Sequence, residues 1–222
     1  MGYVLDFGVV YERLPELLLA ALSTIGLAVA GMSLATLIGV LGVLTRTSKS
    51  RLLRVPTIAF VEVIRNTPFL VQIFFIFFAL PQFGIRLNPT ATAIIALAVN
   101  GGAYAIEIIR GGVESIGKGQ IEAGLALGLH KGQVFRHIVL KPAFRAIYPS
   151  LTSQFIMLTL TTSVCTSIAA YELTSVAQRI ESDTFRSFEV YFSITLIYLA
   201  ISGLMMALFS TISKLLFSYP VR

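Results

Sequence analysis

Long stretches without charged residues dominate the hydrophobic pattern of this chain. Five windows, of 29, 20, 20, 26 and 24 residues, contain no Asp, Glu, Lys or Arg: 17–45, 66–85, 87–106, 146–171 and 190–213. A helix needs about 20 residues to cross the hydrocarbon core of a bilayer. Backbone groups in lipid must be satisfied within their own segment, which favours helices over strands at this length. The pattern predicts an all-α membrane protein, one transmembrane domain over 1–222, with spans at about 14–44, 55–80, 89–109, 148–170 and 190–217.

Composition agrees with this assignment. The chain is 56% hydrophobic and 13% charged, whereas a soluble domain carries roughly a quarter charged residues. Glu12, Arg13 and Glu16 precede the first window in place of a basic stretch, so we expect a permanent span and no cleaved signal peptide. The small residues of that window recur at helical spacing and suit close helix packing: Ala28, Gly31, Ala35 and Gly39. Cys165 is the single cysteine, which excludes an intrachain disulfide and indicates a buried structural thiol.

The net charge of +6 follows the predicted topology. Most basic residues lie after the first and third spans and after the fifth: Arg46, Lys49, Arg51, Arg54, Arg110, Lys118, Lys131, Arg136, Lys141, Arg145, Lys214 and Arg222. The opposite side is acidic: Asp6, Glu12, Glu16, Glu172, Glu181, Asp183 and Glu189. The positive-inside rule places the N-terminus outside and the C-terminus in the cytoplasm of a multi-pass membrane protein. The basic excess is topological, and we expect no nucleic-acid binding.

A polar connector of about 35 residues joins the third and fourth spans, covering about 110–147, and connectors of this length are usually functional. Its segment 112–119 nearly spells a phosphate-binding loop, but Gly119 replaces the required Ser or Thr and no strand precedes it. His130 and His137 lack metal-ligand spacing. No nucleophile–base pair stands out. We expect no nucleotide site, no metal site, no bound cofactor and no catalytic residue in this chain.

The connector predicts two short helices. One covers 120–129, where Gly124 and Gly128, four apart, leave a bare stripe that faces a groove, and it ends at Gly132. The second covers 133–140 and stops at Pro142, because proline lacks the N–H that a helix interior requires.

Polar residues also occur inside the spans. Glu62 and Arg65 are three apart on one helix face and can pair, and the helix is expected to break at Asn66 and Pro68. Polar residues within a membrane indicate a solute pathway, and the candidate substrate-binding residues are Glu62, Arg65, Asn66, Asn100, Tyr104, Glu107, Gln154, Thr161 and Thr162. The alternative is that Glu62, Arg65 and Glu107 form structural pairs near the cytoplasmic ends of their spans.

Three segments carry a resemblance to a known family: FVEVIRNTPFLVQ, AYAIEIIRGGVESIGKGQ and EAGLALGLHKGQVFRHIVLKPAFRAIYPSL. They resemble the permease subunits of binding-protein-dependent ABC importers, in the branch that carries polar amino acids such as histidine, glutamate, glutamine, arginine and opines. The third segment is similar to that family's Glu-Ala-Ala loop, with Gly124 in place of the second alanine. The resemblance runs from about residue 14 to the C-terminus and implies a type I importer permease fold in a bacterial inner membrane.

The resemblance also implies partners. A coupling helix would dock on a separate ATPase subunit, with Glu122 fixing its start and Gly128 permitting close approach, and its residues are Glu122, Ala123, Gly124, Leu125, Ala126, Leu127, Gly128 and Leu129. The partners would be a dimer of ATP-binding subunits that hold ATP and Mg²⁺, an identical or homologous permease, an external solute-binding protein and a polar amino acid. Whether that amino acid is acidic, basic or an amide stays open.

Two rival classes remain. A stand-alone channel or ion-coupled carrier for small polar solutes would transport without ATP, and it would leave the long connector without a purpose. A structural membrane scaffold would need no polar residues in its spans. Copurification with an ATP-hydrolysing subunit separates all three classes.

Overall fold

The computed structural model describes residues 3–217, which are helical with no strand among them. Four segments are long and apolar enough to cross a bilayer: α2 (Leu14–Arg46), α5 (Pro89–Glu114), the stretch Lys131–Ile168 that contains α8 (Leu140–Thr161), and α10 (Ser187–Leu216). A fifth span results if the bent pair Arg51–Arg65 and Phe69–Phe83 is counted as one, and this pair contains α3 (Arg51–Arg65) and α4 (Phe69–Ala79). The predicted all-α membrane fold is confirmed. Arg222, counted among the basic residues above, lies outside the described residues.

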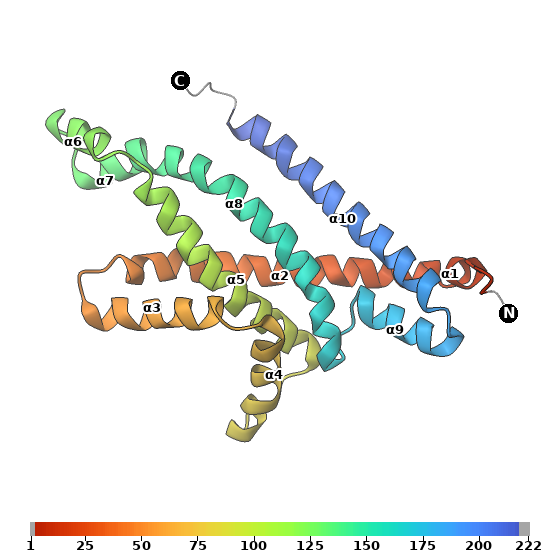
Figure 1. Cartoon of the computed structure of the whole chain (residues 1–222). Coiled ribbons are helices and arrows are strands. Elements are labelled where there is room, and N and C mark those ends of the chain that lie inside the picture. Colours follow the sequence, from red (N-terminus) through yellow and green to blue (C-terminus); the bar gives the residue numbers. More distant parts are fainter. Residues whose placement is uncertain (1–2, 218–222) are drawn as a thin grey trace.

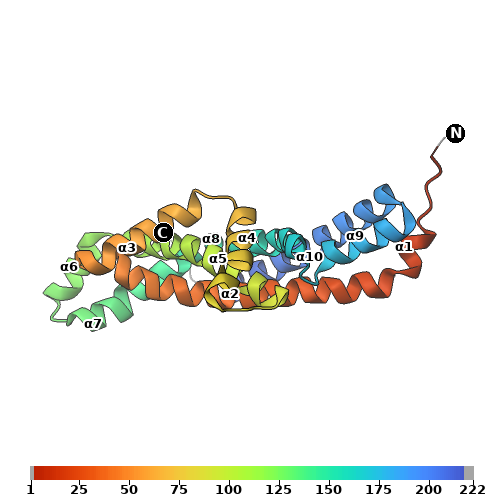
Figure 2. The ribbon, with the colours of Figure 1, turned by 90° about the horizontal axis from the view of Figure 1, so that it is seen from below.

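Short helices lie at both ends of the molecule (Figure 1). At the end that holds the N-terminus lie α1 (Gly8–Glu12) and α9 (Leu173–Thr184) (Figure 1). At the opposite end lie α6 (Lys118–Ala126) and α7 (Lys131–Val134), and Figure 2 shows the same separation from below. Short turns of other helix types complete the chain: η1 (Leu80–Phe83), the π-helical η2 (Phe135–Val139) and η3 (Thr162–Ile168).

The packing of α2 against α5 is close because small residues face one another. A Cβ atom on Gly31 would lie 2.8 Å from Leu97 Cβ, and one on Gly39 would lie 2.6 Å from Ala105 Cβ. From the other side, a Cβ on Gly101 would lie 2.9 Å from Ala35 Cβ. The predicted small-residue stripe of the first span is therefore confirmed as a helix-packing surface.

Two clusters of buried apolar residues lie along α2. The first joins the start of α2 to α9 and α10, with Leu17, Leu173 and Ile194 among its members. The second joins the middle of α2 to α4, α5, α8 and η3, and it includes Ile73 and Cys165. α2 thus connects α9 and α10 at one end of the molecule to the central bundle.

The second predicted span breaks where the sequence indicated. α3 ends at Arg65, α4 begins at Phe69, and the two helices are bent by 112°. The cause is local, because Pro68 cannot donate the backbone hydrogen bond that would continue α3. The bend turns α4 away from the direction of α3 (Figure 1).

The prediction that a cytoplasmic helix stops at Pro142 is wrong. Helical structure runs without interruption from Lys131 through α7, η2 and α8. The π-helical segment η2 shifts the hydrogen-bond register, so Pro142 lies in the first turn of α8, where a helix tolerates proline. α5 also continues to Glu114, beyond its expected end near residue 109, so the connector contains less irregular chain than expected.

Candidate functional site

The turn after α6 is set by a glycine in the left-handed region. α6 ends at Ala126, and Gly128 has φ +84°. Its N–H donates to the Leu125 carbonyl at 3.0 Å, and the Leu129 N–H donates to the Gly124 carbonyl at 3.2 Å, which is the Schellman arrangement at a helix end. The predicted helix through Leu129 is wrong at this end. A Cβ on Gly128 would meet no atom within 4 Å, so the left-handed backbone conformation, and not crowding, favours glycine at this position.

Gly124 faces the protein interior. It is buried against η2, and a Cβ there would lie 2.3 Å from Ile138 Cδ1 and 3.3 Å from Val134 Cγ2. The expected stripe of Gly124 and Gly128 facing a groove is therefore wrong, because α6 packs this side on its own chain. The exposed side instead presents Leu125, at 43% exposure, and Leu127, at 83%.

Among the remaining residues of the predicted coupling segment, Glu122, Ala123 and Ala126 are exposed and Leu129 is half-buried. Glu122 does not begin the helix as the resemblance implied. α6 starts at Lys118 after Gly117, so Glu122 lies in its middle. The start of α6 follows α5 closely, since Ser115, Ile116 and Gly117 alone separate the two helices.

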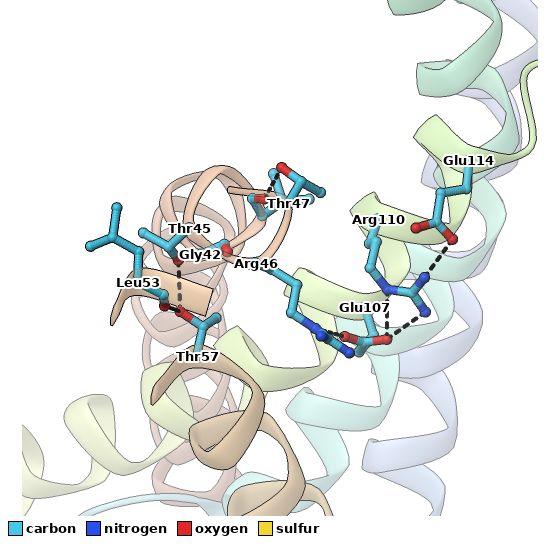
Figure 3. A network of polar contacts seen from close by, with 10 residues as sticks. Gly42, Thr45, Arg46, Thr47, Leu53, Thr57, Glu107, Arg110 and Glu114 are labelled. Atoms are coloured by element: carbon cyan, nitrogen blue, oxygen red, sulfur yellow. Dashed lines mark hydrogen bonds and ion pairs between the residues drawn. The ribbon is translucent and has the colours of Figure 1, made fainter. Parts of the chain in front are cut away.

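A cluster of charges joins α2 to the end of α5 (Figure 3). Glu107 accepts a hydrogen bond from Arg46 Nε at 3.2 Å and from Arg110 Nη2 at 2.8 Å. Arg110 also pairs with Glu114. Close by, the hydroxyls of Thr45 and Thr57 lie 2.8 Å apart and join α2 to α3. Glu107 is thus held by two arginines, which agrees with the structural-pair alternative for this residue.

Glu62 and Arg65 do not form the predicted pair. Asn66 leaves the helix and folds back, so that its Nδ2 donates to the Glu62 carboxylate at 3.1 Å and to the Glu62 carbonyl at 2.7 Å. The Arg65 guanidinium instead lies over the Tyr104 ring, 5.3 Å from its centroid. Such a contact is a favourable cation–π arrangement. At the helix break, Glu62 therefore pairs with Asn66 and Arg65 contacts Tyr104.

Sequence reasoning missed Gln72, which is buried on α4. Asn100 Nδ2 donates to Gln72 Oε1 at 2.9 Å. The structure thereby brings Asn100 to the α3–α4 break, near the Arg65–Tyr104 contact on the next turn of α5. A glutamine four residues after the proline was the available signal.

The candidates on the fourth span lie apart from this group. Thr161 and Thr162 donate to carbonyls of their own helical segment, at 2.8 Å and 2.6 Å. Gln154 is half-buried on α8. Within residues 3–217, no hydrogen bond joins any of the three to Asn100 or Glu62. The nine candidates therefore form one group around the α3–α4 break and α5, and a second group on α8 and η3.

The end of the molecule that holds the N-terminus contains a buried acid, Glu172. Glu172 is fully buried and caps α9, accepting from the Thr174 N–H at 2.8 Å and the Ser175 N–H at 2.6 Å. Tyr198 also donates to it at 3.0 Å, which joins α9 to α10. Burial raises the pKa of the Glu172 carboxyl above its ordinary value. Within the part of the chain that the structure describes, no three His, Cys, Asp or Glu side chains are grouped to hold a metal ion.

Comparison with known proteins decides the family. Residues 38–219 match the family described as "Binding-protein-dependent transport system inner membrane component". The chain belongs to this family. It is therefore a multi-pass permease of the inner membrane, and the fold is that of the type I ABC importer permeases.

Individual relatives and structures agree with this permease assignment. The chain is 37% identical over 199 residues to the "Glutamine transport system permease protein GlnP" of Escherichia coli (strain K12), covering 89% of this chain and 91% of the relative. It is 41% identical over 158 residues to the "L-cystine transport system permease protein TcyB" of Bacillus subtilis (strain 168), covering 71% and 67%. A chain from the "Crystal structure of an amino acid ABC transporter with histidines" matches with TM-score 0.90 and 30% identity, covering 96% of this permease and 99% of that chain.

Proposed function

We propose that this permease moves a polar amino acid into the cytoplasm as the membrane subunit of an ATP-driven importer. The likeness to the amino acid ABC transporter carries the proposal, because it covers 96% of this chain at 30% identity. The names of the relatives support the same substrate class, since they include permeases for glutamine, cystine, nopaline and octopine.

The permease works with partners that perform the chemistry. Two ATP-binding subunits bind and hydrolyse ATP with Mg²⁺, a second permease of identical or homologous sequence completes the membrane unit, and a solute-binding protein delivers the amino acid from outside. Leu125 at the end of α6 and Leu127 in the turn after it are both exposed, which supports α6 and this turn as the ATPase docking element. The permease itself forms and breaks no covalent bond.

The charge distribution supports an N-terminus outside and a C-terminus in the cytoplasm. The basic residues Lys118 and Lys131 lie on α6 and α7, at the end opposite the N-terminus (Figure 1). Glu16 and Asp183 lie at the N-terminal end, on α2 and α9, where Glu16 pairs with Arg179 and Asp183 pairs with Arg13.

Transport follows from two states of the permease, outward-facing and inward-facing, that bind the amino acid with different affinity. Closure of the ATPase dimer on ATP moves α6, and α5 moves with it because three residues separate them. The cavity then opens outward and accepts the amino acid, and hydrolysis returns it to an inward-facing state. We expect some of the polar candidates to line this pathway and others, such as Glu107 between its two arginines, to hold the helices that form it.

Uptake by the reconstituted complex tests the function. The permease is incorporated into vesicles with its ATPase and binding protein, and accumulation of labelled acidic, basic and amide amino acids is measured with and without ATP. We expect ATP-dependent accumulation of at least one of them. Transport by the permease alone under an ion gradient, with no effect of ATP, would establish the carrier alternative instead.

The pathway residues have a separate test in Tyr104. Tyr104→Phe keeps the ring face beneath Arg65, whereas Tyr104→Leu removes it. We expect the leucine variant to change KM or selectivity among amino acids while the phenylalanine variant retains both. Equal kinetics in the two variants would remove this contact from the pathway.

A further inference from the structure

The α3–α4 break leaves a backbone carbonyl without its helical partner in the middle of the second predicted span. In a continuous helix the Ile64 carbonyl would accept the N–H of residue 68, but that residue is proline and has no N–H. A buried carbonyl without a partner is costly, most of all where water is scarce. The chain must therefore satisfy Ile64 from elsewhere.

The side chain of Gln72 supplies the missing donor. Its Nε2 lies 2.7 Å from the Ile64 carbonyl oxygen and 3.0 Å from the Thr67 carbonyl oxygen. Gln72 is only 8% exposed. Backbone carbonyls can only accept, so the amide must point its nitrogen toward them and its oxygen away.

Two neighbouring carbonyls are satisfied from within the turn. Asn66 Nδ2 donates to the Glu62 carbonyl at 2.7 Å, and the Thr67 hydroxyl donates to the Val63 carbonyl at 2.8 Å. Both donors follow α3 directly in the chain. Gln72 differs because it belongs to α4, so its hydrogen bonds join the two helices across the bend.

The free oxygen of the same amide extends the connection to a third helix. Gln72 Oε1 accepts from Asn100 Nδ2 at 2.9 Å, near the middle of α5. Ile73, the next residue, is fully buried in the cluster that contains Leu97 of α5. One side chain thus contacts the end of α3, the turn and α5 while it is fixed to α4.

We propose that Gln72 is the positioning residue of this permease: it holds the α3–α4 bend and ties the bend to α5 through Asn100. Since α5 leads directly into α6, movement of α6 is passed through this amide to the bent pair. The inference deepens the proposed transport function and rests on it. The amide of Asn100 then acts on transport through Gln72, by setting the position of α4.

Distance measurements in the assembled complex test the bend directly. Spin labels are placed at Val63→Cys and Phe78→Cys, which are 60% and 62% exposed on the two helices, in a minority of the permease chains. The natural Cys165 is fully buried and stays unlabelled. The variants are Gln72→Leu, Gln72→Leu with Pro68→Ala, and Asn100→Ala, and the matched control is Gln82→Leu, an exposed glutamine of η1.

We expect one narrow distance in the parent and in the control, and a broad distribution in Gln72→Leu. Adding Pro68→Ala returns an N–H to the Ile64 carbonyl, so the double variant should straighten and give longer distances. A parent-like distribution in both variants would overturn the proposal. If Gln72→Leu fails to assemble, recovery of assembly by Pro68→Ala supports the proposal and failure to recover overturns it.

Asn100→Ala tests the link to α5 alone, because the bonds from Gln72 to the carbonyls remain. We expect the parent distance together with a roughly 10-fold fall in transport turnover, the size that follows from losing one buried hydrogen bond, with KM retained. Parent turnover would overturn the link. Failure of the proposed function would appear differently, as absent ATP-driven uptake in the parent complex, whatever the distances show.

Discussion

Arg46 donates to Glu107 across the α2–α5 interface, with 3.2 Å between the Arg46 Nε and a carboxylate oxygen. The same carboxylate accepts from Arg110, three residues further along α5. Glu107 therefore separates two positive charges near the point where α5 leads into α6.

Removing Glu107 should destabilise the permease more than removing the other acid of the cluster. In Glu107→Ala the two arginines face each other without the carboxylate, and we expect a loss of about 1–3 kcal/mol in the free energy of unfolding. Glu114→Ala is the control, because its side chain is 57% exposed and exposed pairs contribute at most about 1 kcal/mol. Unfolding in detergent measures both, and equal losses would contradict this account.

Alanine substitutions at the adjacent residues Gly111 and Gly112 should change the free energy of unfolding in opposite directions. A Cβ on Gly112 would lie 1.9 Å from Ile147 Cγ2 and 3.2 Å from the Ala143 carbonyl oxygen, whereas one on Gly111 would meet nothing within 4 Å. We expect Gly112→Ala to cost about 1–3 kcal/mol through overpacking. Gly111→Ala should stabilise α5 by up to about 1 kcal/mol, since alanine favours helices. Thermal unfolding of the two variants measures both effects. Unchanged stability in Gly112→Ala would mean that α5 and α8 can move apart at no cost in free energy.

Substitutions of the two glycines in the coupling segment, Gly124 and Gly128, should impair coupling for different reasons. At Gly128 the backbone has φ +84°, so asparagine, which tolerates this region, should preserve coupling better than valine, which does not. At Gly124 the nearest atom is a terminal methyl of Ile138, so alanine should be accommodated and leucine should displace α6. The measurement is uptake together with ATP hydrolysis in the full complex. Equal activity of Gly128→Asn and Gly128→Val would refute the conformational requirement.

The buried Glu172 should make stability depend on pH. Burial raises its pKa in the folded state above the ordinary value of 4.5, so the folded chain binds this proton more tightly than the unfolded chain. Its contribution to stability is complete below the unfolded pKa and is lost as pH rises through the folded pKa. Unfolding followed from about pH 4 to about pH 8 should show a flatter curve for Glu172→Gln than for the parent. Parallel curves would contradict the burial argument.

Much of the architecture is local in origin and could be predicted from the sequence. The length of a charge-free window determines whether a helix can cross a bilayer, and no distant contact is needed to evaluate it. The break at Pro68 was predicted correctly for the same reason. The prediction at Pro142 was wrong because a π-helical register shift precedes it at Phe135–Val139, and the residue pattern of that segment does not distinguish a π-helix from an α-helix.

The sequence by itself therefore determined the fold class, the spans, the basic and acidic ends and the family resemblance, since each depends on the composition of short segments. The tertiary structure alone decided the partners: Arg65 over Tyr104 in place of Glu62, Glu107 between two arginines, and Gln72 between Ile64 and Asn100. A hydrogen bond or ion pair requires two groups at contact distance with the right orientation. For residues on different helices, that distance is set by how the helices bend and cross, which no single segment specifies.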